Sequence, residues 1–178
     1  PTNISIKGNC LAREKYSLDM PNILVVDDVA DNCDLIYNYV TTFEKVNVVT
    51  ATTGWQAIEY YRKYEFALML IDVDMPKMDG FELVREMKTI KTTDLTPIIY
   101  ITGYDKNSKR ATVGYDLGAV DYILKPFDME FLLTKVRVFL KLYHQRKLLE
   151  SEIASKSASQ NVLIESNSMV NNLISESY

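Results

Sequence analysis

Short apolar runs alternate with segments of helical periodicity along most of the chain. Each apolar run is only a few residues long and nearly continuous, which is typical of a strand buried on both faces. We expect strands in "NILVVDD" (from Ile23), "VNVVTA", "FALMLID", "TPIIYIT" and "VDYILKP".

The segments between these runs place apolar residues at helical spacing. "DNCDLIYNYVTTF" does so behind a predicted Asp or Asn N-cap, with Leu35, Ile36, Tyr39, Val40 and Phe43. A second helix is expected from Thr53 to about Tyr64, with Trp55, Ile58 and Tyr61 or Arg62 at turn spacing. "GFELVREMKTI" predicts a third helix, and two more are expected over roughly 106–117 and from near Asp128.

This regular alternation of strand and helix predicts the fold class. Parallel strands need crossover helices, and such helices cover both faces of the sheet. We therefore predict an α/β fold with a doubly wound five-stranded parallel sheet and an extended C-terminal helix. In such sheets the functional groups collect at the carboxyl ends of the strands.

Composition narrows the class of protein. The 178 residues suffice for one domain plus an appendage, and the net charge of −4 does not suggest a nucleic-acid surface. No apolar run approaches the roughly 20 residues of a membrane span. Two cysteines, Cys10 and Cys33, form no disulfide framework, so we expect free thiols and a cytoplasmic location. The start at Pro1 is compatible with an excised fragment of a longer protein.

Charged and hydroxyl residues end the predicted strands. Asp27 and Asp28 end the first, Asp72 the third, Thr102 the fourth and Lys125 the fifth. Clustered carboxylates can bind a hard divalent cation, Mg²⁺ being the expected one. The cation and the lysine would neutralise a phosphoryl group in transfer to an Asp carboxylate.

Four motifs carry a specific resemblance. The set "ILVVDD", "LIDVDMPKMDGFEL", "PIIYITG" and "GAVDYILKPFD", in this order and spacing, resembles the receiver domain of two-component response regulators. The resemblance covers about residues 22–143 and implies a flavodoxin-like receiver fold. It also implies a phosphoacceptor that takes its phosphoryl group from a sensor histidine kinase or a phosphotransfer protein, and that is not otherwise an enzyme.

The resemblance assigns roles to individual residues. Asp72 would be the phosphoacceptor and would bind Mg²⁺ together with Asp28, while Asp27 would act mainly through a metal-bound water. The main-chain carbonyl of Asp74 would also bind the metal, and Thr102 and Lys125 would contact the new phosphoryl oxygens. Tyr122 matches the family's switch aromatic.

Several positions depart from the family's pattern. Val29 stands where Glu often follows the acid pair, and Gly103 stands where a small Ala commonly follows the hydroxyl residue. Tyr104 is bulky and could shield the site. Asp74 adds a carboxylate beside the acceptor, which either tunes the lifetime of the phosphoryl group or faces water.

Two other readings stay open at this stage. A pseudo-receiver would bind partners without ever taking phosphate. A phosphatase related to haloacid dehalogenases would use Asp72 and Asp74 as a nucleophile loop, but Met75-Pro76 and the unexplained acids of the first strand argue against it. His144 lacks the acid that usually follows a phosphorylated kinase histidine, so we expect it on a solvated helix face.

The C-terminal segment predicts a helix that pairs with a second copy. A heptad seam runs through Phe139, Leu142, Leu149, Ile153, Leu163, Val170 and Ile174, interrupted by Arg146, Lys156, Gln160 and Asn167. The expected organisation is a leader (1–20), a receiver domain (21–143) and a coiled-coil extension or linker (144–178). We expect a homodimer through this helix, and no output-domain motif follows in the printed residues.

Overall fold

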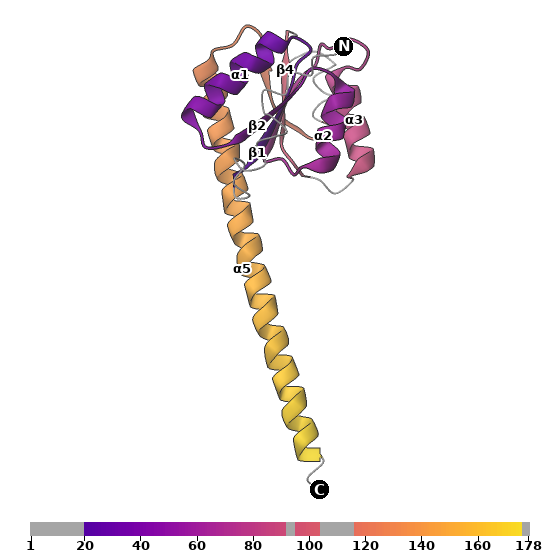
Figure 1. Cartoon of the computed structure of the whole chain (residues 1–178), viewed down its shortest axis with the longest axis vertical. Coiled ribbons are helices and arrows are strands. Elements are labelled where there is room, and N and C mark those ends of the chain that lie inside the picture. Colours follow the sequence, from indigo (N-terminus) through magenta and orange to yellow (C-terminus); the bar gives the residue numbers. More distant parts are fainter. Residues whose placement is uncertain (1–19, 92–94, 104–115, 176–178) are drawn as a thin grey trace, which may run out of the picture. The chain divides into compact units, whose positions relative to one another are not determined.

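The computed structural model describes residues 20–91, 95–103 and 116–175, with side chains described up to 158 and at 160 (Figure 1). Most of the predicted leader and of the helix expected over 106–117 lies outside these ranges, as do Cys10 and Tyr104. The chain divides into two compact units, Pro1–Leu140 and Lys141–Tyr178. Each unit is described by itself below.

The first unit contains a five-stranded parallel sheet in the order β2-β1-β3-β4-β5. This confirms the predicted fold class. The strands are β1 (Asn22–Val26), β2 (Asn47–Ala51), β3 (Leu68–Asp72), β4 (Ile98–Thr102) and β5 (Ala119–Leu124).

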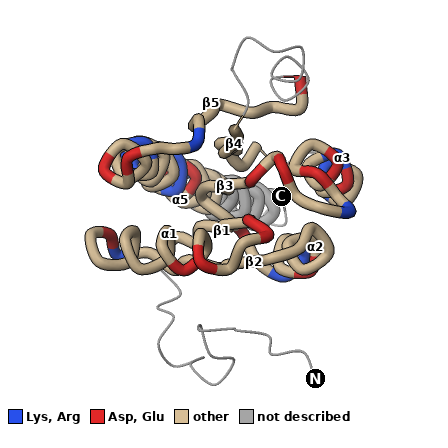
Figure 2. Tube along the Cα trace, turned by 90° about the horizontal axis from the view of Figure 1, so that it is seen from above, with Lys and Arg blue, Asp and Glu red and all other residues tan. Residues whose placement is uncertain are grey.

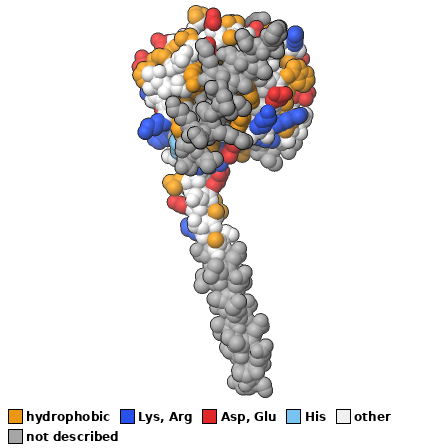
Figure 3. Space-filling model, in the orientation of Figure 1, with side chains coloured by type: hydrophobic (Ala, Val, Ile, Leu, Met, Phe, Trp, Pro, Cys, Tyr) orange, Lys and Arg blue, Asp and Glu red, His pale blue; other side chains and the backbone are white. Residues whose placement is uncertain are grey.

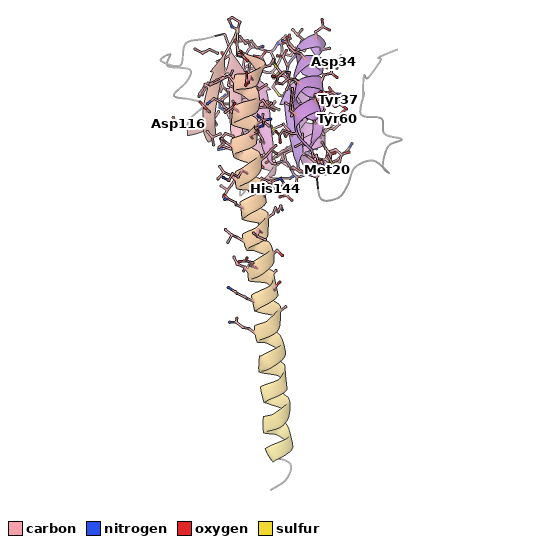
Figure 4. The ribbon with its side chains drawn as sticks, turned by 90° about the vertical axis from the view of Figure 1, so that its left-hand side faces the viewer. Met20, Asp34, Tyr37, Tyr60, Asp116 and His144 are labelled. Atoms are coloured by element: carbon pink, nitrogen blue, oxygen red, sulfur yellow. The ribbon has the colours of Figure 1, made fainter. Side chains whose placement is uncertain are left out.

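Helices cover both faces of this sheet. They are α1 (Ala30–Phe43), α2 (Gly54–Lys63), α3 (Gly80–Ile90) and α5 (Met129–Ser175), within which the division into two units falls. Seen along the strands, α1 and the first turns of α5 lie on one side of the sheet and α2 and α3 on the other (Figure 2). Figure 4 looks onto the layer of α1 and α5, where Arg137 Nε bonds Glu44 Oε1 at 2.6 Å.

The core lies between the sheet and these helices. The central strands β3 and β4 are buried along their whole length, because helices cover both of their faces. Leu24, Leu70 and Ile99 are 0% exposed, and burying each such side chain stabilises the fold by roughly 1.5–3 kcal/mol. This rigid sheet positions the residues that follow each strand.

The start of α1 differs from the prediction. Its N-cap is Val29, which provides no side-chain cap, so the predicted Asp or Asn cap was wrong. Asn32 lies inside the helix and donates its side-chain amide to Asp27, a residue of the loop after β1. The Asn32 side chain therefore makes a tertiary contact with Asp27 and does not cap the helix.

The buried stripes are narrower than the apolar spacing suggested. On α1 the buried residues are Cys33, Ile36 and Val40, whereas Leu35 and Phe43 are 54% and 53% exposed. These two side chains point away from the sheet because the stripe that faces it is only one residue wide per turn.

The second helix has the predicted bounds, and of the apolar positions predicted for it Ile58 and Tyr61 are buried, whereas Trp55 is not. Thr53 caps α2 by accepting the amide of Gln56 at 3.2 Å. Trp55 is 65% exposed. The first turn instead approaches the loop before α3 through Gly54, where an added Cβ would lie 2.5 Å from Met78 Sδ.

The second unit is helical and locally stabilised. Glu150 pairs with Arg146 and Lys147 at 3.5 Å each, and both cations also face the ring of Tyr143. His144, labelled in Figure 4, is exposed, as expected for a solvated helix face. Among the described residues, no helix is both long and apolar enough to cross a membrane.

Candidate functional site

Three carboxylates meet where β1 and β3 end. Val26 of β1 lies opposite Ile71 of β3 in the sheet, so the residues after this pair, Asp27 and Asp72, are neighbours. One carboxylate oxygen each of Asp27, Asp28 and Asp72 lies within 4.8 Å of the others. Asp27 and Asp72 are 2% and 3% exposed, whereas Asp28 is exposed. The predicted acidic cluster is therefore present, at the sheet edge where Figure 2 shows acidic residues.

Lys125, directly after β5, reaches the same cluster. Its Nζ lies 2.7 Å from Asp72 Oδ2 and 3.0 Å from Asp27 Oδ2, so one ammonium bridges the two buried carboxylates. Its backbone N–H donates to the carbonyl of Thr102 at 2.8 Å, and its peptide bond to Pro126 is cis. The pairing of β5 with β4 thus places Lys125 at the carboxyl ends of the strands, where its side chain reaches the acids.

Asp27 is held by more groups than the sequence suggested. Its Oδ1 accepts the backbone N–H of Val29 at 2.9 Å, and both of its oxygens accept the Asn32 amide at 3.0 Å. Together with Lys125 these donors occupy much of its acceptor capacity. Asn32 is a site residue that sequence reasoning missed. Its signal was its place in the first turn of the helix after the acid pair.

The loop after Asp72 orients the proposed acceptor. The backbone N–H of Asp74 donates to Asp72 Oδ1 at 3.1 Å, while Lys125 holds the other oxygen. An added Cβ at Gly80 would lie 2.5 Å from the carbonyl oxygen of Asp72, so only glycine allows α3 to begin this close to β3. Asp79 closes the turn with a capping box on Glu82.

Thr102, the last residue of β4, is 4% exposed. Its Oγ1 lies 3.4 Å from Asp74 Oδ2 and donates to it. Asp74 is exposed to solvent, and its carboxylate also contacts the hydroxyl next to the acid cluster.

Tyr122 lies in the core rather than in the cluster. It is 1% exposed, and its ring centroid is 5.4 Å from that of Tyr100, its partner in the register of β4 and β5. The ring lies in the core of this structure, and the role of Tyr122 as the switch aromatic stays a prediction.

The pocket is electrostatically unbalanced toward negative charge. Burial raises the pKa of Asp72, and the hydrogen bonds from Lys125 and the Asp74 N–H offset only part of that rise. For Lys125, burial lowers the pKa, but the bonds to Asp72 and Asp27 outweigh it, so the pKa is raised and the side chain is a cation. One ammonium faces three carboxylates. An all-oxygen, anionic site of this kind fits Mg²⁺.

Cys33 of α1 contacts the backbone of Asp27 next to the pocket. Its thiol donates to the carbonyls of Asp27 and Ala51 at 3.5 and 3.7 Å. Burial raises its pKa to about 12, so the reactive thiolate is scarce at neutral pH. Cys33 is a buried free thiol, and the free state is as expected.

Residues 23–137 match the response regulator receiver domain family. The chain belongs to this family, which consists of signalling phosphoacceptor modules rather than conventional enzymes; this sets the phosphatase alternative aside.

Among curated proteins the chain is 33% identical over 135 residues to the response regulator ArlR of Staphylococcus aureus, covering 74% of this chain and 58% of that protein. It is 31% identical over 147 residues to a probable cyclic di-GMP phosphodiesterase of Vibrio cholerae, covering 79% of this chain and 33% of that protein. The chain thus spans about a third to somewhat over half of these relatives.

Solved structures show the same fold. A CheY-like receiver domain protein from Methanospirillum hungatei matches with a TM-score of 0.64 and 27% identity, over 71% of this chain and 98% of that one. The receiver domain of DrrB, described as BeF3-activated, matches with a TM-score of 0.59 and 29% identity over 68% and 98%. DrrB is a protein of Thermotoga maritima.

Proposed function

We propose that Asp72 accepts a phosphoryl group from a sensor histidine kinase or a phosphotransfer protein, in a reaction that needs Mg²⁺. The observation that carries this proposal is the position of Lys125 Nζ, 2.7 Å from Asp72 Oδ2, in a pocket that also contains Asp27 and Asp28. The DrrB receiver is described as activated by BeF3, which supports a phosphoryl-type ligand for the same kind of pocket.

In the transfer step the protein mainly positions the reacting groups and stabilises charge. A carboxylate oxygen of Asp72 attacks phosphorus, and the bond from phosphorus to the donor's leaving atom breaks, with its electron pair leaving on the donor. Lys125 moves from pairing two carboxylates to pairing the new phosphoryl oxygens. Water attack on phosphorus would later release phosphate and restore the Asp72 carboxylate.

The donor set fits a bound Mg²⁺. We assign Asp28 and Asp72 as its direct protein ligands, with the main-chain carbonyl of Asp74 and, through water, Asp27. When bound, the ion supplies positive charge to the phosphoryl oxygens during transfer. The many donors already on Asp27 support its indirect role.

The signal would leave the pocket through β4 and β5. Thr102 and Lys125 are joined by a backbone hydrogen bond of 2.8 Å, and Tyr122 lies three residues before Lys125 in the buried sheet. We propose that the phosphoryl group draws the Thr102 hydroxyl toward it and thereby changes the packing around Tyr122. A cytoplasmic output domain or partner would read that change.

One experiment separates this function from the pseudo-receiver alternative. The intact chain is incubated with Mg²⁺ and a small phosphodonor, and its mass is measured. A phosphoacceptor gains one labile phosphoryl group, absent in Asp72→Asn and strongly reduced in Asp28→Ala. No gain in the wild-type chain, with correct folding by circular dichroism, would favour a pseudo-receiver.

We further propose that residues 144–178 form a helical extension that pairs with a second copy of the chain. Three residues of the predicted heptad seam are well exposed in the second unit: Leu142 (52%), Leu149 (58%) and Ile153 (67%). In the view of Figure 3, a few hydrophobic and charged side chains are visible on the described part of this helix. Two such seams would bury each other in a parallel coiled coil.

Sedimentation tests the pairing directly. The intact chain is compared with a truncated chain that ends at Lys141, both at about 0.1 mM, a concentration that detects weak association. We expect a dimer for the intact chain and a monomer for the truncated one. Equal monomer masses would leave residues 144–178 as a linker.

A further inference from the structure

We propose that Asp74 is a positioning residue that holds the Thr102 hydroxyl away from the phosphoryl site and so sets the threshold for switching. This inference rests on the proposed function of Asp72. It concerns a side chain to which the receiver resemblance gave no role, since that resemblance involved only the main-chain carbonyl of Asp74.

The contact is built by the loop after β3. The N–H of Asp74 bonds Asp72 Oδ1 at 3.1 Å, which anchors its backbone to the acceptor. Its side chain then reaches across to β4, where Oδ2 accepts from Thr102 Oγ1 at 3.4 Å. Thr102 is 4% exposed, so water has little access to this contact.

A threonine hydroxyl has a single proton to donate. If Thr102 donates to Asp74, it cannot make a full hydrogen bond to a phosphoryl oxygen on Asp72 at the same time. Switching therefore requires an exchange of acceptors. The separation of 3.4 Å exceeds the usual 2.5–3.0 Å for hydroxyl donors, so the hold is weak enough to be released by a better acceptor.

Asp74 opposes the phosphorylated state in a second way. A phosphoryl group adds about −1.5 to −2 charges next to a carboxylate that is already negative. Because Asp74 is exposed, solvent screens this repulsion, but the hydrogen-bond exchange with buried Thr102 is not screened in the same way. Charge and hydrogen bonding are separable by substitution.

Two variants separate them. Asp74→Asn removes the charge and keeps an oxygen that can accept from Thr102, whereas Asp74→Ala removes both. Each is made in the wild-type chain and in Thr102→Ala. Glu86→Gln, at an exposed position on α3, serves as the control for net charge.

The measurement is calorimetric titration of the intact chain with beryllofluoride, a phosphoryl analogue, at saturating Mg²⁺. Mg²⁺ alone is titrated separately, to detect any effect on the metal site. We expect Asp74→Ala to bind beryllofluoride on the order of threefold to tenfold more tightly than wild type, and Asp74→Asn by a smaller factor. In the Thr102→Ala background, Asp74→Ala should increase the affinity for beryllofluoride by no more than Asp74→Asn does.

The outcomes discriminate clearly. The inference is overturned if Asp74→Ala binds beryllofluoride with wild-type affinity. It is also overturned if, in the Thr102→Ala background, Asp74→Ala still binds more tightly than Asp74→Asn by the same factor. Either result leaves the proposed function intact. If the wild-type chain binds Mg²⁺ but no beryllofluoride, the proposed function fails, and the role of Asp74 fails with it.

Discussion

The acid pocket and the helical second unit are stabilised in opposite ways. In the pocket, Lys125 contacts Asp72 and Asp27 across 53 and 98 residues of sequence. In the described part of the second unit, the ion pairs of Arg146 and Lys147 with Glu150 span four and three residues, and large apolar side chains such as Leu149 and Ile153 are exposed.

This difference indicates which kind of binding partner suits each region. The pocket has its buried charges paired by the fold but keeps an excess of carboxylates, which suits the cation and phosphoryl group proposed above. The described part of the helix pairs charges locally but leaves apolar side chains exposed, which suits the helix pairing proposed above. The expected outcomes below test this contrast, from the largest effect to the smallest.

The same Leu→Ala truncation should lower the free energy of unfolding far more in the first unit than in the second. Leu24→Ala, at a position 0% exposed in β1, should lower the free energy of unfolding by about 2–5 kcal/mol. Leu149→Ala, at a position 58% exposed, should change it by less than about 0.5 kcal/mol in the monomer. Urea denaturation at micromolar concentration measures both. Comparable losses would mean that the helix is packed within the monomer.

Removal of the bridging cation should destabilise the pocket. Lys125→Met leaves two buried carboxylates without their shared ammonium, and we expect a loss of about 1–3 kcal/mol in metal-free buffer, since the lysine side chain is 30% exposed. Added Mg²⁺ should recover part of it. Lys45→Met, at an exposed position, is the control. Unchanged stability of Lys125→Met would show that the acids are not strained by mutual repulsion.

Neutralising the acceptor should stabilise the metal-free chain. Burial raises the pKa of Asp72 above its ordinary 3.8, so the folded state holds this proton more tightly than the unfolded state does. The wild-type chain accordingly loses stability as pH rises from about 4 through the raised pKa. Asp72→Asn, which has no such proton to lose, should gain on the order of 1 kcal/mol over wild type at neutral pH.

Thermal unfolding of both proteins from pH 4 to pH 8 tests this sign. The advantage of Asp72→Asn should grow with pH in metal-free buffer and shrink when Mg²⁺ is added. An advantage that is largest at low pH would contradict the assigned direction of the shift.

The smallest effect is expected at Tyr100. Its ring is 0% exposed between Phe81 and Tyr122, and within the described part of the chain its hydroxyl has no hydrogen-bond partner. Tyr100→Phe should therefore raise the free energy of unfolding by roughly 0.5–1 kcal/mol. Tyr60→Phe is the matched control, because its hydroxyl accepts from Gln56 at 3.2 Å and its loss should give no gain. A destabilised Tyr100→Phe would indicate a partner for that hydroxyl.

Much of the pocket was predictable because strand ends are predictable. Apolar runs that end in Asp27, Asp72, Thr102 and Lys125, together with the expectation of a parallel sheet, imply that these residues share one edge. The contact of Asn32 with Asp27 and that of Asp74 with Thr102 were not predicted. Both depend on the conformations of the loops after β1 and β3, which leave no periodic trace in the sequence.

The sequence by itself determined the order of the strands and helices that the structure describes, the residues at the strand ends and the heptad pattern, because all of these depend on local periodicity and spacing. The tertiary structure decided which apolar residues are buried, as the exposed Trp55 and Leu35 show. It also decided the partners of Asp27 and the inward position of Tyr122. These depend on the packing of helices against the sheet and on contacts between distant residues, which local spacing does not encode.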